Sequence, residues 1–501
     1  MKQKNDRNGL APCLAVLGTG SDVGKSIVTA ALCRCFAKQG VRVAPYKSQN
    51  MSNNSGVTAE GLEMGRAQIV QAEAAGIVPN VDMNPILLKP TSDVGSQVII
   101  LGRAKENSTA MAYHRKKNRL FTEAKKALIR LRRRYDLVIM EGAGSCAEVN
   151  LMAHDIVNLP MAAYAKAPVI LVGDIHRGGI FAQFIGTLGC LSYENNQRIA
   201  GFLVNRFRGD RRLFQEGVKW IENRTQKPVF GVLPWYNHFT IASEDSVVIE
   251  TPKRVDLKPN EKPAIAVIRI PHISNFTDFD ALATIEELGV YYVEKPQNLS
   301  PFAAVIIPGS KNTRFDLNWL KKTGWETLLS DYVQNNGHLT GICGGYQMMG
   351  ESVCDPDGLE GAPGSTKGLG FLPVKTDLMA PKTTTLTRFT WGDKPGSGYE
   401  IHMGQTRRLD GRALLTVQNR NGRAIVDEEG CYGNNGRCMG TYMHGFFDTR
   451  AITARWLAEI GLTDIRLPQN FGWTAKDRAY ELLSEHFEAH VNVKAVEDLL
   501  T

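Results

Sequence analysis

A glycine-rich loop near the start of the chain constrains the fold more than any other feature of the sequence. The segment Gly18–Ser26 (GTGSDVGKS) follows the apolar run Leu14–Leu17 and precedes a helical pattern at Ile27–Gln39, which ends at Gly40. A strand, a glycine loop and a helix in this order favour phosphate binding, because glycines let backbone N–H groups turn toward a phosphate at the positive end of the helix. The strict pattern has glycine where Thr19 stands, so this loop is a variant whose first glycine lies one place early. The alternative is a tight strand-to-helix turn that contains Gly-Lys-Ser by chance.

The loop predicts a nucleotide site built from one contiguous segment. Its residues are Gly20, Ser21, Asp22, Gly24, Lys25 and Ser26. Lys25 would offset phosphate charge, and the hydroxyl group of Ser26 could reach a Mg²⁺ ion. Glu141 follows the buried run Leu137–Met140, at the sheet edge where open parallel sheets bind ligands, and could complete the metal shell. Asp174 ends another apolar run and has a weaker claim to the same role; helix capping is the alternative for both acids.

Two polar segments follow predicted strands and are dense in hydrogen-bonding groups. They are Lys47–Ser55 (KSQNMSNNS) and Asp174–Gly179 (DIHRGG). We interpret both as substrate loops, with solvated surface loops as the alternative. The candidate contacts are Lys47, Gln49, Asn50 and Arg177.

Apolar runs that alternate with helical patterns indicate two α/β domains. The first series predicts a parallel-sheet domain over residues 11–236. Residues 237–262 include a polar, proline-containing stretch without periodicity, which predicts a linker. A second series starts at Ala264–Ile268, and we expect a second α/β domain over residues 263–450 and a helical extension over residues 451–501.

The second domain carries a cysteine in the setting of a catalytic nucleophile. Cys343 lies within Gly341–Gly350 (GICGGYQMMG), where a buried strand meets a helix through a glycine-flanked turn. Such an elbow exposes the side chain, and a helix start just beyond the sulfur favours the thiolate. His444, at the end of a short apolar strand in Gly440–Phe446 (GTYMHGF), is the candidate general base. A buried structural cysteine and a core histidine are the alternatives.

A third strand end would complete this acyl-transfer site. The segment Val305–Lys311 (VIIPGSK) ends a predicted strand in a glycine loop. The N–H groups of Gly309 and Gly344 are the predicted oxyanion hole, which would stabilise a tetrahedral intermediate.

Charge and composition exclude several classes of function. The net charge of +8 suits anionic substrates, but the basic residues are spread out except at Arg130–Arg134, which we interpret as a solvated helix end rather than a nucleic-acid patch. No run of about 18 apolar residues occurs, and the polar start lacks the apolar stretch of a signal peptide. Nine cysteines without zinc-site spacing suit a reducing compartment. We expect a cytoplasmic protein that binds small molecules, with neither nucleic acid nor a membrane as partner.

The cysteine and histidine motifs resemble those of class I, or triad-type, glutamine amidotransferases. In the larger group a glutamate stands two places after the histidine, whereas this chain has Phe446. Loss of that glutamate is a hallmark of the corrin-ring amidase branch, which implies a Cys343–His444 dyad and leaves open what orients the imidazole. The front half resembles dethiobiotin synthetase-like ATPases, which implies a P-loop domain that uses ATP and Mg²⁺ and holds no tightly bound prosthetic group.

Further motifs resemble the cobyric acid synthase family. They are Gln49–Ser55 (QNMSNNS), Glu63–Gln68 (EMGRAQ), Met83–Pro90 (MNPILLKP), Glu141–Ser145 (EGAGS), Asn205–Asp210 (NRFRGD) and Gly398–Gly404 (GYEIHMG). The resemblance spans roughly residues 13–450. Two positions depart from it: Cys146 stands where the family usually has proline, and His176 where aspartate is usual.

This resemblance implies amidation of the b, d, e and g carboxylates of adenosylcobyrinic acid a,c-diamide to give adenosylcobyric acid. ATP would activate each carboxylate, and ammonia would come from glutamine. The expected partners are therefore a corrinoid polycarboxylate, glutamine and ATP, with a homodimer as a further expectation. The nearest rival is a cobyrinic acid a,c-diamide synthase. A cell-wall lipid amidotransferase and a nucleotide switch with a degenerate glutaminase domain are more distant alternatives.

Overall fold

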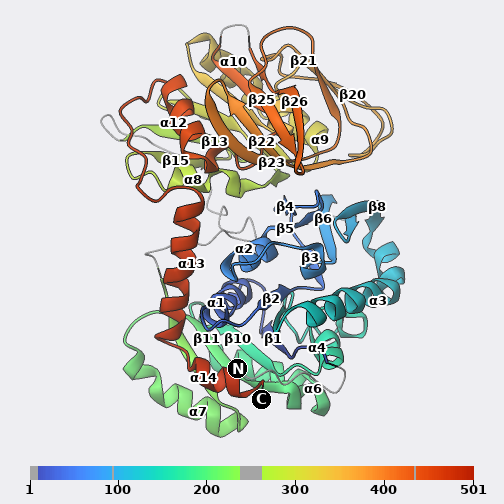
Figure 1. The fold of residues 1–501 in the computed structure, drawn as a ribbon, viewed down its shortest axis with the longest axis vertical. Coiled ribbons are helices and arrows are strands. Elements are labelled where there is room, and N and C mark those ends of the chain that lie inside the picture. The colour runs from blue at the N-terminus through green and yellow to red at the C-terminus, as the bar shows by residue number, and fades with distance from the viewer. Residues whose placement is uncertain (1–8, 93–94, 237–261, 434–435, 501) are drawn as a thin grey trace.

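Two predominantly parallel sheets, one in each half of the chain, organise the fold (Figure 1). Both halves are α/β, as predicted from the sequence. Residues 237–261, most of the predicted linker, lie outside the described part of the chain. The computed structural model describes residues 9–92, 95–236, 262–433 and 436–500.

The first sheet has six parallel strands in the order β12-β11-β10-β1-β9-β2. Strands β1, β9 and β10 are buried along their whole length, which is why they read as continuous apolar runs. The strands are β1 (Cys13–Gly18), β2 (Val43–Tyr46), β9 (Leu137–Glu141), β10 (Val169–Asp174), β11 (Ile199–Phe207) and β12 (Val229–Pro234). The helices of this half are α1 (Lys25–Lys38), α2 (Arg66–Ala74), α3 (Ala110–Arg134), α4 (Leu159–Ala165), α5 (Ile180–Cys190), α6 (Tyr193–Arg198) and α7 (Gln215–Thr225).

Short strands of the first half lie on the side that faces the second half (Figure 1). One small sheet has the order β3-β6-β7-β8, and β4 pairs with β5 in a two-stranded sheet. Strand β4 also contacts β22 and β23 of the second half. The strands are β3 (Gln49–Met51), β4 (Ser55–Val57), β5 (Glu63–Gly65), β6 (Ile86–Ser92), β7 (Gly95–Ile100) and β8 (Arg103–Thr109).

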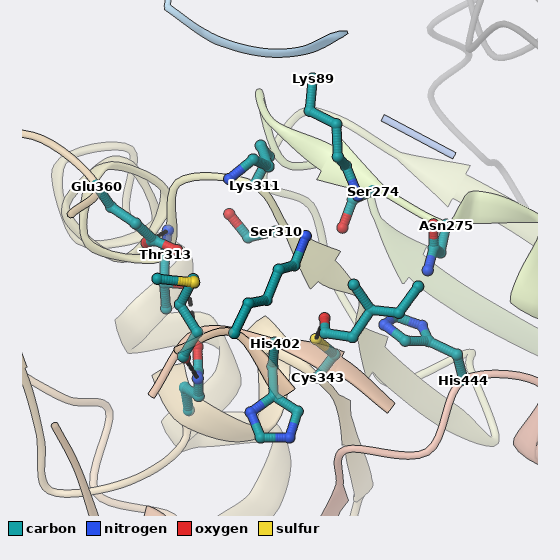
Figure 2. Close-up of a pocket in the computed structure, with 14 residues that line it drawn as sticks. Lys89, Ser274, Asn275, Ser310, Lys311, Thr313, Cys343, Glu360, His402 and His444 are labelled. Carbon is teal, nitrogen blue, oxygen red and sulfur yellow. Dashed lines mark hydrogen bonds between the residues drawn. The ribbon is translucent and has the colours of Figure 1, made fainter. Parts of the chain in front are cut away.

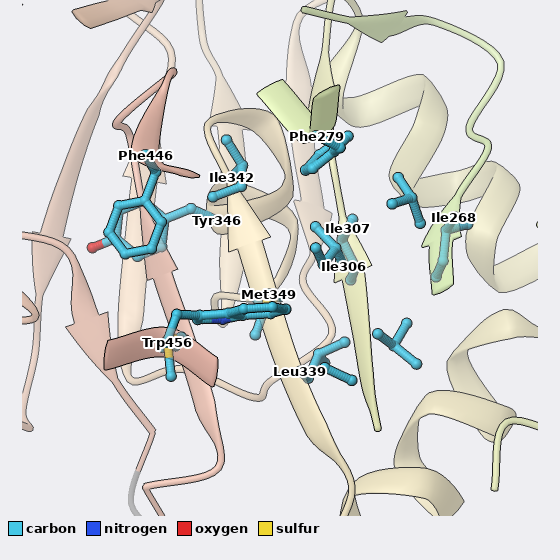
Figure 3. Close-up of a cluster of buried hydrophobic side chains, with 14 of the residues drawn as sticks. Ile268, Phe279, Ile306, Ile307, Leu339, Ile342, Tyr346, Met349, Phe446 and Trp456 are labelled. Carbon is cyan, nitrogen blue, oxygen red and sulfur yellow. The ribbon is translucent and has the colours of Figure 1, made fainter. Parts of the chain in front are cut away.

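The second sheet has the order β15-β13-β16-β18-β28-β27, and all its pairs are parallel except that of β27 with β28. Its core joins strand residues such as Ile306 and Ile342 to Phe446 and Trp456 (Figure 3). Each such buried side chain stabilises the fold by roughly 1.5–3 kcal/mol. The strands are β13 (Ala264–Ile268), β15 (Gly289–Val293), β16 (Ala304–Ile307), β18 (His338–Ile342), β27 (Cys431–Tyr432) and β28 (Cys438–Thr441). The helices are α8 (Asp280–Ala283), α9 (Thr313–Lys322), α10 (Trp325–Gln334) and α11 (Gly344–Met348).

Smaller sheets surround the second sheet. A two-stranded sheet pairs β14 with β17, and two four-stranded sheets have the orders β20-β19-β21-β24 and β23-β22-β25-β26. The strands are β14 (Ile273–Ser274), β17 (Gly309–Ser310), β19 (Ser352–Asp355), β20 (Gly364–Lys367), β21 (Val374–Asp377), β22 (Thr383–Trp391), β23 (Lys394–His402), β24 (Gln405–Arg408), β25 (Leu415–Arg420) and β26 (Arg423–Glu429).

The C-terminal segment returns to the first half of the chain. Helix α12 (Arg450–Glu459) packs into the second-half core, whereas α13 (Trp473–Glu488) runs along α1, and α14 (Val493–Asp498) packs against the same part of the first half (Figure 1). Arg34 of α1 forms ion pairs of 3.1 Å with Asp477 and with Glu481 of α13. The helix that follows the glycine loop is therefore joined to the C-terminal segment.

The basic run Arg130–Arg134 ends α3, as predicted, but it is not solvated throughout. Arg133 and Arg134 are exposed, whereas Arg132 is buried and donates to the carbonyl oxygen of Ala11 at 2.7 Å. The Arg132 side chain therefore connects the end of α3 to the segment that precedes β1.

In the described part of the chain, no helix is long and apolar enough to cross a membrane.

Candidate active site

Cys343 lies in a strained turn between β18 and α11. Its φ of 52° and ψ of −109° are rare for a residue with a side chain, and such strain costs about 1–3 kcal/mol and is concentrated at functional sites. The neighbouring glycines are required by space: a Cβ on Gly345 would lie 1.9 Å from the carbonyl oxygen of Ile307. The backbone N–H of Cys343 donates to Thr441 at 2.8 Å, so the turn is held against β28. This is the elbow that the sequence predicts.

His444 lies directly beyond β28 and interacts with the Cys343 side chain. Its ring Nδ1 lies 2.7 Å from a carboxylate oxygen of Asp278, and both side chains are buried. Burial alone would lower the pKa of His444, but the charge of Asp278, with a further contribution from Cys343, raises this pKa to about 10. Because Nδ1 faces the carboxylate, the other ring nitrogen faces the thiol, and His444 is a strong base toward it.

Asp278 takes the orienting position that the missing glutamate leaves open. It lies in the 3₁₀ helix Phe276–Phe279, and its second carboxylate oxygen accepts the N–H of Gly445 at 2.9 Å. Phe446 cannot substitute for it, because its ring is buried and stacks on Phe389. The sequence reasoning missed Asp278: an acidic residue ahead of a short apolar run reads as an ordinary helix start.

The predicted oxyanion residues lie on neighbouring segments. Gly309 belongs to β17 and Gly344 begins α11. A Cβ on Gly344 would lie 2.7 Å from the backbone nitrogen of Ser310, and one on Gly309 would lie 3.3 Å from the His444 ring. Glycine at both positions therefore allows the backbone to approach the sulfur and the imidazole closely, and the oxyanion role itself stays a prediction.

The cysteine and histidine face a pocket to which both halves of the chain contribute (Figure 2). Lys89, on β6 of the first half, lines this pocket together with second-half residues. The lining residues are Lys89, Ser274, Asn275, Ser310, Lys311, Thr313, Cys343, Gln347, Glu360, Lys382, Ile401, His402, Met403 and His444. The pocket therefore lies where the two halves meet.

A buried ion cluster joins the halves beside this pocket. Glu63 of β5 binds Lys89 at 2.9 Å and, across the interface, Lys382 at 2.7 Å. Burial alone would raise the pKa of Glu63, but the two lysines hold it well below its usual range, and burial lowers the pKa of Lys382 to about 7. A second link is the N–H of Ser55, which donates to the Asn275 side chain at 2.9 Å. Asn275 precedes the 3₁₀ helix that carries Asp278, so the first half contacts the turn behind His444.

The glycine loop has the geometry of a phosphate cradle. Gly24 has φ 98°, and a Cβ there would lie 2.0 Å from the side-chain nitrogen of Asn205, so only glycine fits. The Lys25 ammonium group donates to the carbonyl oxygens of Gly20 and Gly144, at 2.8 and 3.0 Å. The lysine therefore folds across the loop, where a phosphate would replace these carbonyl partners.

Ser26 and Glu141, which are 115 residues apart in the sequence, meet directly. The Ser26 hydroxyl donates to the Glu141 carboxylate at 2.8 Å, and buried Lys47 donates to the same oxygen at 2.9 Å. The side-chain amide of Gln71 binds the second carboxylate oxygen. A hydroxyl and a carboxylate beside a phosphate cradle are the oxygen ligands that Mg²⁺ prefers, so these residues fit the predicted metal.

Asp174 and Asp22 are engaged elsewhere. Asp174 accepts the N–H of His176 at 2.7 Å and pairs with Arg206 at 2.9 Å, and Arg206 also pairs with Asp22 at 2.9 Å. Asp174 therefore binds His176 and Arg206 and not the Ser26–Glu141 pair that fits a metal, and its weaker metal role stays a prediction. Arg177 is exposed, consistent with a loop that is open to a ligand.

The remaining predicted contacts lie in the first half. Gln49 accepts a hydrogen bond from Tyr113, and buried Asn50 donates to Gln68 at 3.1 Å. Of the two departures from the family, Cys146 is buried and its N–H donates to Gly18 at 3.0 Å. The His176 ring lies against Trp235, with 5.2 Å between ring centroids.

Comparisons with known proteins cover nearly the whole chain. Residues 14–248 match the CobQ/CobB/MinD/ParA nucleotide binding domain, and residues 264–452 match the CobB/CobQ-like glutamine amidotransferase domain. A cobyric acid synthase of Chlorobium phaeobacteroides (strain BS1) is 47% identical over 97% of this chain and 99% of its own length. This chain belongs to the cobyric acid synthase family. Two further cobyric acid synthases support this assignment. The protein of Chlorobaculum tepidum is 46% identical over 96% of each chain. The protein of Chloroflexus aggregans is 48% identical over 90% of this chain and 92% of its own length. The predicted family and the predicted fold class are confirmed.

Proposed function

We propose that this protein uses ATP and glutamine to amidate the b, d, e and g carboxylates of adenosylcobyrinic acid a,c-diamide, giving adenosylcobyric acid. The observation that carries the proposal is a pocket lined by the Cys343 thiol, by the His444 imidazole that Asp278 holds, and by Lys89 of the nucleotide-binding domain. The relatives that match nearly the whole chain are named cobyric acid synthases, and this name supports a corrinoid substrate.

In the glutaminase half-reaction, Cys343 attacks the side-chain amide of glutamine. His444 takes the thiol proton and gives it to the departing ammonia, while Asp278 keeps the imidazole oriented and stabilises its charge. Gly309 and Gly344 direct N–H groups at the developing oxyanion. The resulting thioester is then cleaved by water, with His444 as the base.

In the synthetase half-reaction, the chain positions a phosphate. When bound, ATP with Mg²⁺ supplies the phosphoryl group that turns an unreactive carboxylate into an acyl phosphate. Lys25 would neutralise phosphate charge, and Ser26 and Glu141 would hold the metal. Lys47 donates to the same carboxylate at 2.9 Å and keeps it ionised beside the phosphate loop.

Ammonia passes between the two half-sites without entering bulk water. The pocket supports this step, because Lys89 of the first half and Lys382 of the second half line it together with Cys343, and Glu63 binds both lysines. We place the reaction in the cytoplasm, a reducing compartment that suits a chain with nine cysteines. A homodimer stays a prediction, which size-exclusion chromatography with light scattering would test.

The experiment is to supply purified enzyme with each candidate acid, ATP, Mg²⁺ and glutamine, and to measure the mass of each product. Four amide additions to the a,c-diamide are the expected result. Two additions to cobyrinic acid, with none to the a,c-diamide, would instead identify an a,c-diamide synthase. The absence of glutamine hydrolysis would favour a nucleotide switch.

A further inference from the structure

Asn275 is held in a backbone conformation that few residues other than glycine adopt. Its φ of 51° and ψ of 42° lie in the left-handed region, which asparagine and aspartate tolerate better than other residues with a side chain. It directly precedes the 3₁₀ helix Phe276–Phe279, and its carbonyl oxygen accepts the N–H of Asp278 at 3.0 Å. The conformation of Asn275 therefore helps to set the direction in which the Asp278 side chain leaves the backbone.

The Asn275 side chain does not cap the helix that it precedes. An asparagine in this position usually accepts an N–H of the first helical turn, but the described residues of this turn show no such bond. Its Oδ1 atom instead accepts the backbone N–H of Ser55 at 2.9 Å, and both residues are buried. Ser55 belongs to β4 of the first half, 220 residues away, so this side chain forms a bond between the halves. Loss of the acceptor would leave a buried N–H unsatisfied, which is costly.

Ser55 is itself anchored by the buried ion cluster. Its hydroxyl group donates to Glu63 at 2.8 Å and accepts from Lys89 at 2.8 Å. Its backbone pairs with Gly65 in the two-stranded sheet of β4 and β5. The N–H group that meets Asn275 therefore comes from a firmly held part of the first half.

The segment that ends at Ser55 also reaches the phosphate site. Lys47, at the other end of Lys47–Ser55, donates to Glu141 at 2.9 Å. One segment thus contacts the carboxylate beside the glycine loop and, through Ser55, the turn that carries Asp278. The two half-sites are therefore joined through one short stretch of the chain.

We infer that Asn275 is a positioning residue that couples the Lys47–Ser55 segment to Asp278. Held in this way, Asp278 keeps His444 oriented toward the thiol, so the first half sets the rate of glutamine hydrolysis. This assignment rests on the proposed glutaminase function. Figure 2 shows Asn275 on the same side of the pocket as His444. A misplacement of about 1 Å can cost a catalytic group about 100-fold in rate, so an Asp278 carboxylate that loses this support lowers kcat.

The test is the kinetics of glutamate release by the full-length enzyme. Asn275→Gly keeps the left-handed backbone, which glycine adopts freely, and removes only the acceptor for Ser55. Its kcat for glutamine should fall about 10- to 100-fold with KM within about 3-fold of the wild type, while ammonia-driven amidation is retained. Asn275→Asp keeps both the backbone and an acceptor oxygen, so kcat should return to within about 3-fold of the wild type. A raised KM with an unchanged kcat would show that Asn275 binds glutamine, and would overturn the assignment.

Asn421→Gly is the matched control. Asn421 has a φ of 50°, and its side-chain oxygen accepts the N–H of Leu386 at 2.8 Å. It also faces the first half, since a Cβ on Gly61 would lie 2.3 Å from its amide nitrogen. Because these contacts do not involve Asp278, Asn421→Gly should leave kcat and KM within about 3-fold of the wild type.

The outcomes separate this assignment from the function on which it rests. If Asn275→Gly keeps kcat within about 3-fold of the wild type, the assignment is wrong although the glutaminase function stands. The same holds if Asn421→Gly lowers kcat equally, or if Asn275→Gly lowers ammonia-driven amidation by the same factor, because the effect is then a general loosening of the two halves. If the wild type does not hydrolyse glutamine, the proposed function fails first.

Discussion

Replacing Asp278 by asparagine tests the catalytic geometry most directly. The change keeps the shape of the side chain but removes the charge that lies 2.7 Å from Nδ1 of His444. Asparagine can also present its amide N–H to the ring, which would favour the wrong tautomer, with the proton on the nitrogen that faces Cys343. We expect the imidazole to lose both its orientation and its strength as a base.

The size of the effect follows from burial. His444 is 1% exposed and Asp278 is 4% exposed, so solvent screens their interaction weakly. Removing one partner of a buried charge pair costs about 3–5 kcal/mol. If this loss falls on the transition state, it corresponds to a fall in kcat of about 10²- to 10⁴-fold.

The assay is glutamate release at saturating glutamine, beside amidation driven by ammonium chloride. Asp278→Asn should lose the first activity and keep the second. Asp280→Asn removes a carboxylate two residues away that does not bind His444, and it should change kcat by less than about 3-fold. If Asp278→Asn retains glutaminase activity within about 3-fold of the wild type, Asp278 does not orient His444 and the reasoning is refuted.

The same pair predicts a pH dependence of stability. The pKa of His444 is raised from about 6.5 to about 10 in the folded protein, so its contribution to stability is fully present below pH 6.5 and is lost as the pH rises through 10. Asp278→Asn removes most of this contribution. The stability difference between wild type and variant in urea unfolding should therefore be larger at pH 6 than at pH 10, and an equal difference at both would contradict the shift.

Three other changes probe the rest of the site. Cys343→Ala should abolish glutamine-driven amidation and keep ammonia-driven amidation; an equal loss of both would refute the division of labour. Glu141→Gln should raise the Mg²⁺ concentration needed for half-maximal amidation while leaving glutamine hydrolysis intact, and an unchanged Mg²⁺ requirement would remove it from the metal site. Lys382→Met breaks the link to Glu63 across the interface and should raise the number of glutamines hydrolysed per amide formed several-fold. A stoichiometry equal to that of the wild type would show that this cluster does not retain ammonia.

Several parts of the fold could be predicted because their signals are local. The strand, loop and helix around Gly18–Ser26 are contiguous, and Gly24 is required by its own backbone angle and by its neighbour Asn205. The turn at Cys343 is likewise flanked by the glycines that it needs. The position of Arg132 at a helix end predicted a solvent-exposed side chain. In the structure the side chain is buried, because it donates to the carbonyl oxygen of Ala11.

The sequence by itself predicted the phosphate loop at Gly18–Ser26, the cysteine turn at Cys343 and the family. Each of these two sites is built around a short segment whose residue types and spacing already specify its backbone. Only the tertiary structure decided which distant groups complete them. Asp278 is 166 residues from His444, and Glu63 of one half meets Lys382 of the other. Such partners carry no shared local pattern, since contact between them is produced by the packing of two sheets and not by neighbouring residues in the chain. The imidazole's partner and the ion cluster between the half-sites therefore became visible only in three dimensions.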